Sequence, residues 1–150
     1  MNQRLPLALD VRGRRVLLVG AGQVAARKIA PLVRAGARVE VVAPTLSVPV
    51  EEKLTAGQLV AQRRPFTPDD LTGTWLVYAL TDSPELNEQV AALCEERAIW
   101  CLLGGASHKS SVWSLAHRWQ GSELVAVSGD GNPHRALALL KRISKALGWD

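Results

Sequence analysis

Several kinds of residue and segment are scarce in this sequence, and each scarcity excludes a class of protein. Only two residues are cysteine, and Cys94 and Cys101 have no CxxC spacing, which argues against a disulfide framework and a metal site. No apolar run approaches the ~20 residues of a membrane-spanning helix, and the first residues lack the apolar core of a signal peptide. There is no lysine-rich tail and no nucleic-acid-binding motif. We therefore expect a cytoplasmic protein with buried thiols, no metal, no membrane and no nucleic-acid partner.

The composition that is present is typical of a packed globular chain. With 47% hydrophobic and 21% charged residues, the sequence is neither disordered nor fibrous. A chain of 150 residues is long enough for one domain, or one domain with a short appendage. The net charge of +4 is uneven, with basic residues concentrated in 1–50 and acidic residues in 51–100. Basic segments attract phosphates or a polycarboxylate ligand, but a solvated surface explains them equally well.

Short apolar runs alternate with helical patterns, which predicts parallel strands joined by crossover helices. We expect strands at 15–19, 38–42, 59–62, 75–79 and 99–103, and helices at 24–35, 50–56 and 84–97. Pro31 should kink or shorten the first helix. Beyond the second glycine of Gly104-Gly105 the pattern changes to an irregular, tryptophan-bearing stretch over 106–121. A strand at 123–128 and a final helix follow, and that helix carries a stripe of Leu139, Leu140, Ile143 and Leu147.

The turn after the first expected strand carries the clearest motif. Residues 20–25 read Gly-Ala-Gly-Gln-Val-Ala, which fits G-x-G-x-x-A between a buried strand and a helix. Gly20 permits a tight turn, Gly22 lets backbone N–H groups approach a pyrophosphate, and Ala25 is small enough for close helix packing. The alternative is a glycine-lined turn that binds nothing. We predict an α/β fold with a Rossmann-like parallel sheet and a small C-terminal αβ dimerisation extension, divided into a dinucleotide-binding domain (1–112) and an extension for dimerisation or substrate (113–150).

The acidic residue that usually binds the adenine ribose is missing from this pattern. The second strand ends in Val42-Ala43-Pro44-Thr45, and Glu40 lies inside the strand rather than at its tip. Backbone groups at Pro44 and the Thr45 hydroxyl are the available substitutes. Residue chemistry therefore does not distinguish NAD from NADP.

Further segments resemble the precorrin-2 dehydrogenase and sirohydrochlorin ferrochelatase family, which includes the N-terminal region of siroheme synthase. The matching residues are Leu5-Pro6-Leu7, 20–28 with Arg27-Lys28, 35–39, 42–44, Ala79-Leu80-Thr81-Asp82 with Asn87, and 124–128. The resemblance covers nearly the whole chain. It implies a homodimer that uses NAD to oxidise precorrin-2, a tetrapyrrole, to sirohydrochlorin on the route to siroheme or cobalamin. By position it implies cofactor contacts at Gly20, Gly22, Gln23, Val24, Pro44, Thr45 and Thr81.

The sequence departs from this family after the fifth expected strand. The family has an Asn and, three residues later, an Asp with an acid–base or chelating role, but these positions hold Leu102 and Gly105. Residues 112–116 replace a proline-containing segment, and the chain ends where the family continues into further dimerisation helices. A glycine can neither move a proton nor hold a metal, so metal insertion is not expected. The alternative function is a non-catalytic dinucleotide- or tetrapyrrole-binding homologue, and whether the protein is an enzyme stays open.

Other residues are candidates for the missing chemistry. His108 is the best substitute acid–base group, because histidine is the side chain most often used for proton transfer, although it also fits an exposed loop. Lys109, His134 and Arg135 are candidate contacts for substrate carboxylates, against the alternative of a solvated surface. Asp82 is interpreted as the cap of the helix that begins near Pro84. Among the tryptophans, Trp113 and Trp119 are candidates for stacking on a flat ring, whereas Trp75 and Trp100 are expected in the core.

Overall fold

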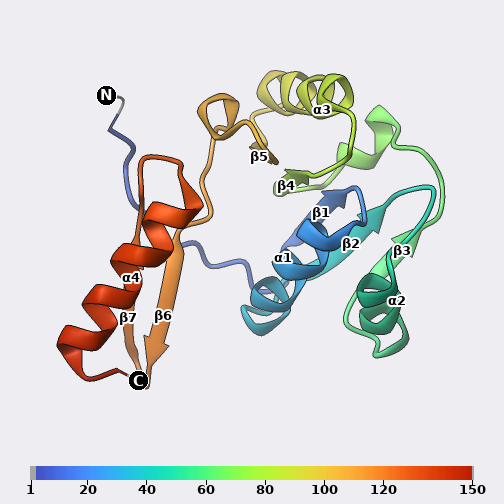
Figure 1. The fold of residues 1–150 in the computed structure, drawn as a ribbon. Helices are drawn as coiled ribbons and strands as arrows, with labels where there is room; N and C mark the ends of the chain where they lie inside the picture. The colour runs from blue at the N-terminus through green and yellow to red at the C-terminus, as the bar shows by residue number, and fades with distance from the viewer. Residues whose placement is uncertain (1–2, 150) are drawn as a thin grey trace. The chain divides into compact units, whose positions relative to one another are not determined.

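The computed structural model describes residues 3–149, which form two compact units (Figure 1). The N-terminal unit ends at Gly105 and the C-terminal unit begins at Ala106. The sequence boundary near residue 112 lies a few residues later, and the functional division into 1–112 and 113–150 stays a prediction. Among residues 3–149, no helix is long and apolar enough to span a membrane.

The N-terminal unit is built on a five-stranded parallel sheet with the strand order β3-β2-β1-β4-β5. Its strands are β1 (Arg15–Val19), β2 (Arg38–Val42), β3 (Val60–Gln62), β4 (Leu76–Ala79) and β5 (Trp100–Leu103). The helices are α1 (Gln23–Arg34), α2 (Val48–Thr55), α3 (Pro84–Glu96) and the short 3-10 helix η1 (Pro68–Leu71). The chain moves in opposite directions from β1 through β2–β3 and through β4–β5. Since crossovers are right-handed, α1 and α2 cover one face and α3 the other. The predicted α/β class with a Rossmann-like sheet is confirmed.

The core of the N-terminal unit lies around the central strand. Val16, Leu17, Leu18 and Val19 are all buried because helices cover both faces of the sheet at β1. This explains why β1 reads as a continuous apolar run rather than an alternating one. The expected shortening of α1 by Pro31 is wrong, since the helix continues to Arg34; the proline stands in the last turn and removes only its own N–H from the helical hydrogen bonds.

The C-terminal unit is an antiparallel hairpin of β6 (Ala116–Gln120) and β7 (Glu123–Val127), with α4 (Pro133–Leu147) packed against it. A 3-10 helix, η2 (Ser107–Lys109), precedes the hairpin. The prediction of an irregular stretch over 106–121 is therefore wrong where it includes β6. The residue pattern did not predict this strand, because its half-buried face carries Arg118 while its exposed face carries Trp119. This is the reverse of the apolar-inside, polar-outside alternation that indicates a strand.

The apolar stripe of α4 is only partly covered within the chain. In α4 the buried residues are Ala136 and Ser144, whereas Leu139 and Leu147 of the stripe are exposed, because only a two-stranded sheet covers the helix. One expectation about burial is wrong: Trp100 is 37% exposed rather than part of the core. Its ring lies 5.3 Å from that of the half-buried Trp75, at the amino-terminal edge of the sheet.

Candidate functional site

The turn between β1 and α1 packs directly against the turn between β4 and α3. Gly20 has φ +106° and donates its N–H to the carbonyl oxygen of Val42 at 3.0 Å. A Cβ atom at Gly20 would lie only 2.6 Å from the Leu80 carbonyl oxygen and 2.9 Å from the Thr81 nitrogen. Glycine is therefore required here both by the backbone conformation and by the close approach. The direction of the strand order changes between β1 and β4, which is where open parallel sheets bind ligands.

Gly22 fulfils a different requirement two residues later. It is the N-cap of α1, with φ −83°, and a Cβ atom there would meet nothing within 4 Å. No side chain caps α1, and its first turn carries no acidic residue. The first intrahelical bond runs from Ala26 to Gly22, so the preceding N–H groups of the helix have no helical acceptor. An open surface with unsatisfied donors at a helix N-terminus suits an anionic group such as a pyrophosphate.

Positive charge follows on the second turn of α1. Arg27 is exposed and Lys28 is half-buried. Burial lowers the pKa of Lys28, and the neighbouring Arg27 lowers it further. Both effects disfavour the charged ammonium, whereas an anion bound close to Lys28 would favour it and so oppose both effects.

The turn between β2 and α2 borders the glycine turn. The N–H of Ser47 donates to the carbonyl oxygen of Ala21 at 2.9 Å, and Pro44 and Thr45 in the same turn are exposed. No carboxylate stands at the end of β2. Glu40, the nearest acid along the strand, is 2.7 Å from the guanidinium of Arg15, and this pair lies nearer the amino ends of β1 and β2.

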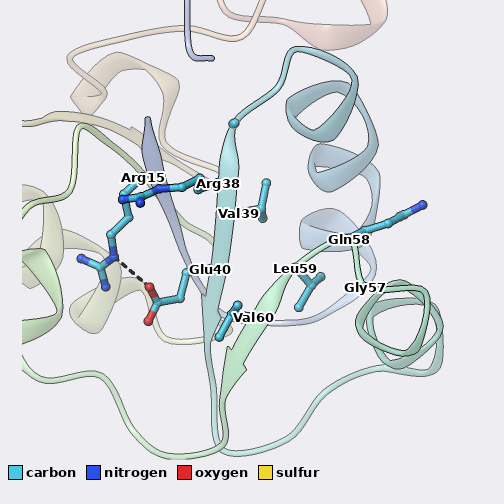
Figure 2. Close-up of a pocket in the computed structure, with 9 residues that line it drawn as sticks. Arg15, Arg38, Val39, Glu40, Gly57, Gln58, Leu59 and Val60 are labelled. Carbon is cyan, nitrogen blue, oxygen red and sulfur yellow. Dashed lines mark hydrogen bonds and ion pairs between the residues drawn. The ribbon is translucent and has the colours of Figure 1, made fainter. Parts of the chain in front are cut away.

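Figure 2 shows the groove in which that ion pair lies. The groove encloses about 450 Å³ and is lined by Arg15, Arg38, Glu40 and apolar residues that include Leu59 and Val60. Arg15 also donates to the carbonyl oxygens of Asp70 and Thr72, so its guanidinium is held by the protein itself. The groove lies at the amino ends of β1 to β3, at the opposite end of these strands from the glycine turn. It is therefore separate from the candidate site.

The turn after β4 is held by the buried side-chain amide of Asn87, a residue that belongs to the family resemblance but had no predicted role. Asn87 is 5% exposed, and its Oδ1 accepts from the Thr81 N–H at 3.0 Å and from the Thr81 hydroxyl at 2.7 Å. Its Nδ2 donates to the Thr81 carbonyl at 3.1 Å. The available signal was a polar residue in register with buried Val90 and Cys94 on α3. The predicted cap is wrong, because Ser83 rather than Asp82 accepts from the Leu86 N–H.

The remaining candidates lie in the C-terminal unit. His108 and Lys109 belong to η2, and His134 and Arg135 to the first turn of α4, and all four are exposed. A Cβ atom at Gly131 would lie 2.5 Å from the Ser107 hydroxyl oxygen, so the turn before α4 abuts η2 and brings these basic residues to one end of the unit. Gly105, where the family resemblance implies an Asp, is exposed with φ +72°. Within residues 3–149, no group of three His, Cys, Asp or Glu side chains could hold a metal ion.

The structure thus brings the predicted contacts of each unit together. Gly20, Gly22, Gln23 and Val24 line the glycine turn, Pro44 and Thr45 border it through Ser47, and Thr81 abuts Gly20 from the other side. Trp113, a candidate for ring stacking, is half-buried and donates its indole N–H to the Ser107 carbonyl at 2.7 Å. Trp119 is 58% exposed.

Comparisons with known proteins agree with this geometry. Residues 7–114 match the family described as "Putative NAD(P)-binding". The siroheme synthase of Photorhabdus laumondii is 45% identical over 145 residues, which are 95% of this chain and 30% of that protein. The siroheme synthase of Edwardsiella ictaluri is 34% identical over 142 residues, covering 95% of this chain and 31% of the relative. The chain therefore spans about a third of the length of these curated relatives. The solved structure of SirC, a precorrin-2 dehydrogenase, superposes with a TM-score of 0.70 at 29% identity, over 97% of this chain and 70% of SirC.

Proposed function

Because this chain belongs to the NAD(P)-binding family of the precorrin-2 dehydrogenases and the N-terminal region of siroheme synthases, we propose that it oxidises precorrin-2 to sirohydrochlorin with NAD. The observation that carries the proposal is the pair of glycines. Gly20 closes the turn against Leu80, and Gly22 leaves open space at an uncapped helix N-terminus. These residues fit a dinucleotide, since a pyrophosphate needs close backbone approach and N–H donors.

Each part of the site has a defined task in this proposal. The N–H groups of Gln23 and Val24 bind the pyrophosphate, Pro44 and Thr45 contact the adenosine end, and Thr81 fixes the nicotinamide end. The nicotinamide supplies the hydride acceptor when bound. The protein then contributes mainly binding and alignment, which together lower the barrier by removing unproductive orientations.

The basic end of the C-terminal unit is the proposed contact for the substrate. Precorrin-2 is a polycarboxylate, and Lys109, His134 and Arg135 offer cationic donors on two segments that Gly131 holds together. His108, on the same 3-10 helix as Lys109, is the proposed proton acceptor. Turnover that is unchanged in His108→Ala would remove His108 from the mechanism and leave alignment as the protein's contribution.

The decisive experiment is an anaerobic assay with freshly prepared precorrin-2 and NAD, in which sirohydrochlorin and NADH are followed together. Matched appearance of both products supports the dehydrogenase. A Gly22→Ala variant is the internal control. Its methyl group would meet no protein atom but would enter the space that the pyrophosphate would use, so dinucleotide affinity should fall while the fold is kept. Failure to bind any nicotinamide dinucleotide contradicts the proposal.

A second function is favoured by one specific observation, the absence of a side chain at Gly105. In that alternative the chain binds a dinucleotide or tetrapyrrole without converting it. Binding without turnover supports the alternative, and Gly105→Asp then tests the reason. Nothing lies within 4 Å of a Cβ there, and Asp tolerates positive φ better than most residues, so the variant should fold. A gain of turnover in Gly105→Asp would show that the missing carboxylate is what separates the two functions.

We also propose that two copies pair through the outer face of the hairpin. His117, Trp119, Leu124 and Ala126 alternate along β6 and β7 on the face away from Arg118 and Val125, and Trp119 and Leu124 are 58% and 39% exposed. Pairing would remove this apolar surface from water. Light scattering across a concentration series should detect a dimer that Trp119→Glu dissociates, and a wild-type monomer mass at every concentration contradicts pairing.

A further inference from the structure

The end of β2 lacks the group that normally makes such a site selective for NAD. A carboxylate at this position accepts a hydrogen bond from the ribose 2′-hydroxyl and repels a 2′-phosphate. Here the strand runs into buried Ala43 and exposed Pro44 and Thr45, none of which is acidic. Glu40 cannot act in its place, because it is inside the strand and paired with Arg15. The tip of β2 itself therefore carries no acidic side chain.

An arginine stands beside the same tip, on the neighbouring strand. In the parallel register Val42 pairs with Gln62, and the Ala43 N–H donates to the Gln62 carbonyl at 3.1 Å. Arg63, the next residue, therefore leaves β3 at the edge where Pro44 and Thr45 leave β2. Its side chain is 51% exposed. This places a guanidinium at the adenosine end of the site.

The Arg63 guanidinium is held by an acid from α2. Both terminal nitrogens contact the Glu51 carboxylate, with Nη2 at 2.8 Å from Oε2, and the Nε–H has no acceptor among residues 3–149. Arg63 lowers the pKa of Glu51, so this carboxylate is ionised at neutral pH. Arg64, by contrast, pairs with Asp70, whose side chain is only 6% exposed, and also donates to the Pro65 carbonyl. The Glu51 side chain is 39% exposed, so the Arg63 pair is the one that a competing anion can reach.

From this arrangement we infer that Arg63 sets the dinucleotide specificity of the site, which accepts a nicotinamide dinucleotide carrying a 2′-phosphate alongside NAD. The inference rests on the proposed dinucleotide-binding function. Arginine binds phosphate through several N–H donors, and a phosphate dianion competes with Glu51 for them. Glu51, on the first turn of α2, already accepts hydrogen bonds from Arg63. It therefore competes with a phosphate for the guanidinium rather than binding the ribose.

The test is a comparison of NADH and NADPH dissociation constants on the full chain, measured by nicotinamide fluorescence. We expect the two values to lie within roughly tenfold of each other for the unmodified protein. Arg63→Gln should weaken NADPH by roughly tenfold or more, the loss of charge-assisted hydrogen bonds, and leave NADH within about twofold. Glu51→Gln should tighten NADPH and leave NADH unchanged. Lys53→Gln, which removes one positive charge on α2 near Glu51, is the matched control and should weaken NADPH far less than Arg63→Gln.

The outcomes separate this inference from the function on which it rests. Strong NADH binding with NADPH weaker by more than about tenfold would overturn the specificity role and leave the dehydrogenase proposal intact. Equal weakening of both dinucleotides by Arg63→Gln, or equal effects of Arg63→Gln and Lys53→Gln on NADPH, would also overturn it. Absence of binding by either dinucleotide would contradict the proposed function itself.

Discussion

The most demanding prediction concerns Gly20, where two independent costs coincide. In Gly20→Ala a side chain must adopt φ +106°, and its Cβ meets the Leu80 carbonyl oxygen at 2.6 Å. The conformational cost is about 1–2 kcal/mol. Displacing a backbone carbonyl that belongs to a hydrogen-bonded strand end adds about 1–3 kcal/mol, as overpacking does in a core. The alanine gains about 0.4–1 kcal/mol because it restricts the unfolded chain. We therefore expect a loss of about 1–5 kcal/mol in the free energy of unfolding.

Gly22→Ala is the matched control because it places the same methyl group two residues away, at φ −83°, with nothing within 4 Å. Alanine is a poorer helix N-cap than glycine, and this loss roughly offsets the gain from restricting the unfolded chain. Urea denaturation followed by circular dichroism should show Gly22→Ala within about 1 kcal/mol of the parent protein. Its dinucleotide affinity should nevertheless fall. Equal stabilities for Gly20→Ala and Gly22→Ala would refute the reasoning from close backbone approach.

Two further predictions follow from buried polar groups. Asn87→Ala should destabilise the protein by about 1–3 kcal/mol, because Thr81 loses the partner of its N–H and carbonyl. It should also weaken dinucleotide binding more than a variant elsewhere with the same loss of stability. Calorimetric titration at a temperature where the variant is folded measures this affinity. Arg64 and the Thr67 N–H hold the pKa of the buried Asp70 below its usual value. The ionised carboxylate therefore stabilises the fold at pH values above the pKa of an unfolded aspartate, about 3.9, and this contribution is lost as the pH falls through the pKa of Asp70 in the folded protein. Stability curves between pH 7 and pH 2 should therefore be flatter for Asp70→Asn, and parallel acid limbs would contradict the assignment.

The sheet and the glycine turn were predictable because local rules determine them. A strand covered on both faces must be apolar throughout, and β1 satisfies this along its length. Gly20 and Gly22 have distinct backbone requirements that depend mainly on the strand, turn and helix in which they stand. For this reason the five strands were expected within about a residue or two of their observed bounds, which is the usual uncertainty of such limits.

The interactions that the sequence did not reveal depend on contacts between distant segments. The Arg63–Glu51 pair forms only because β3 adds beside β2 and α2 covers that edge. The strand β6 is stabilised by pairing with β7 and by packing of α4, not by its own residue pattern. Exposure of Trp100 likewise follows from its place at the end of an edge strand, where periodicity treats it as one more apolar residue.

The proposed function places dinucleotide binding and the position of the implied family Asp in different parts of the N-terminal unit. The proposed binding of the dinucleotide relies on backbone N–H groups and on the absence of side chains at Gly20 and Gly22, which the central strands fix. Gly105 lies beyond β5 at the end of the N-terminal unit, and the carbonyl contacts that define the glycine turn come from Val42 and Leu80. A glycine in place of the acid that the family resemblance implies there removes a proton acceptor without removing a contact of the turn. The proposed dinucleotide binding and the proposed turnover therefore depend on different residues, so each must be measured on its own, and affinity alone is not evidence of catalysis.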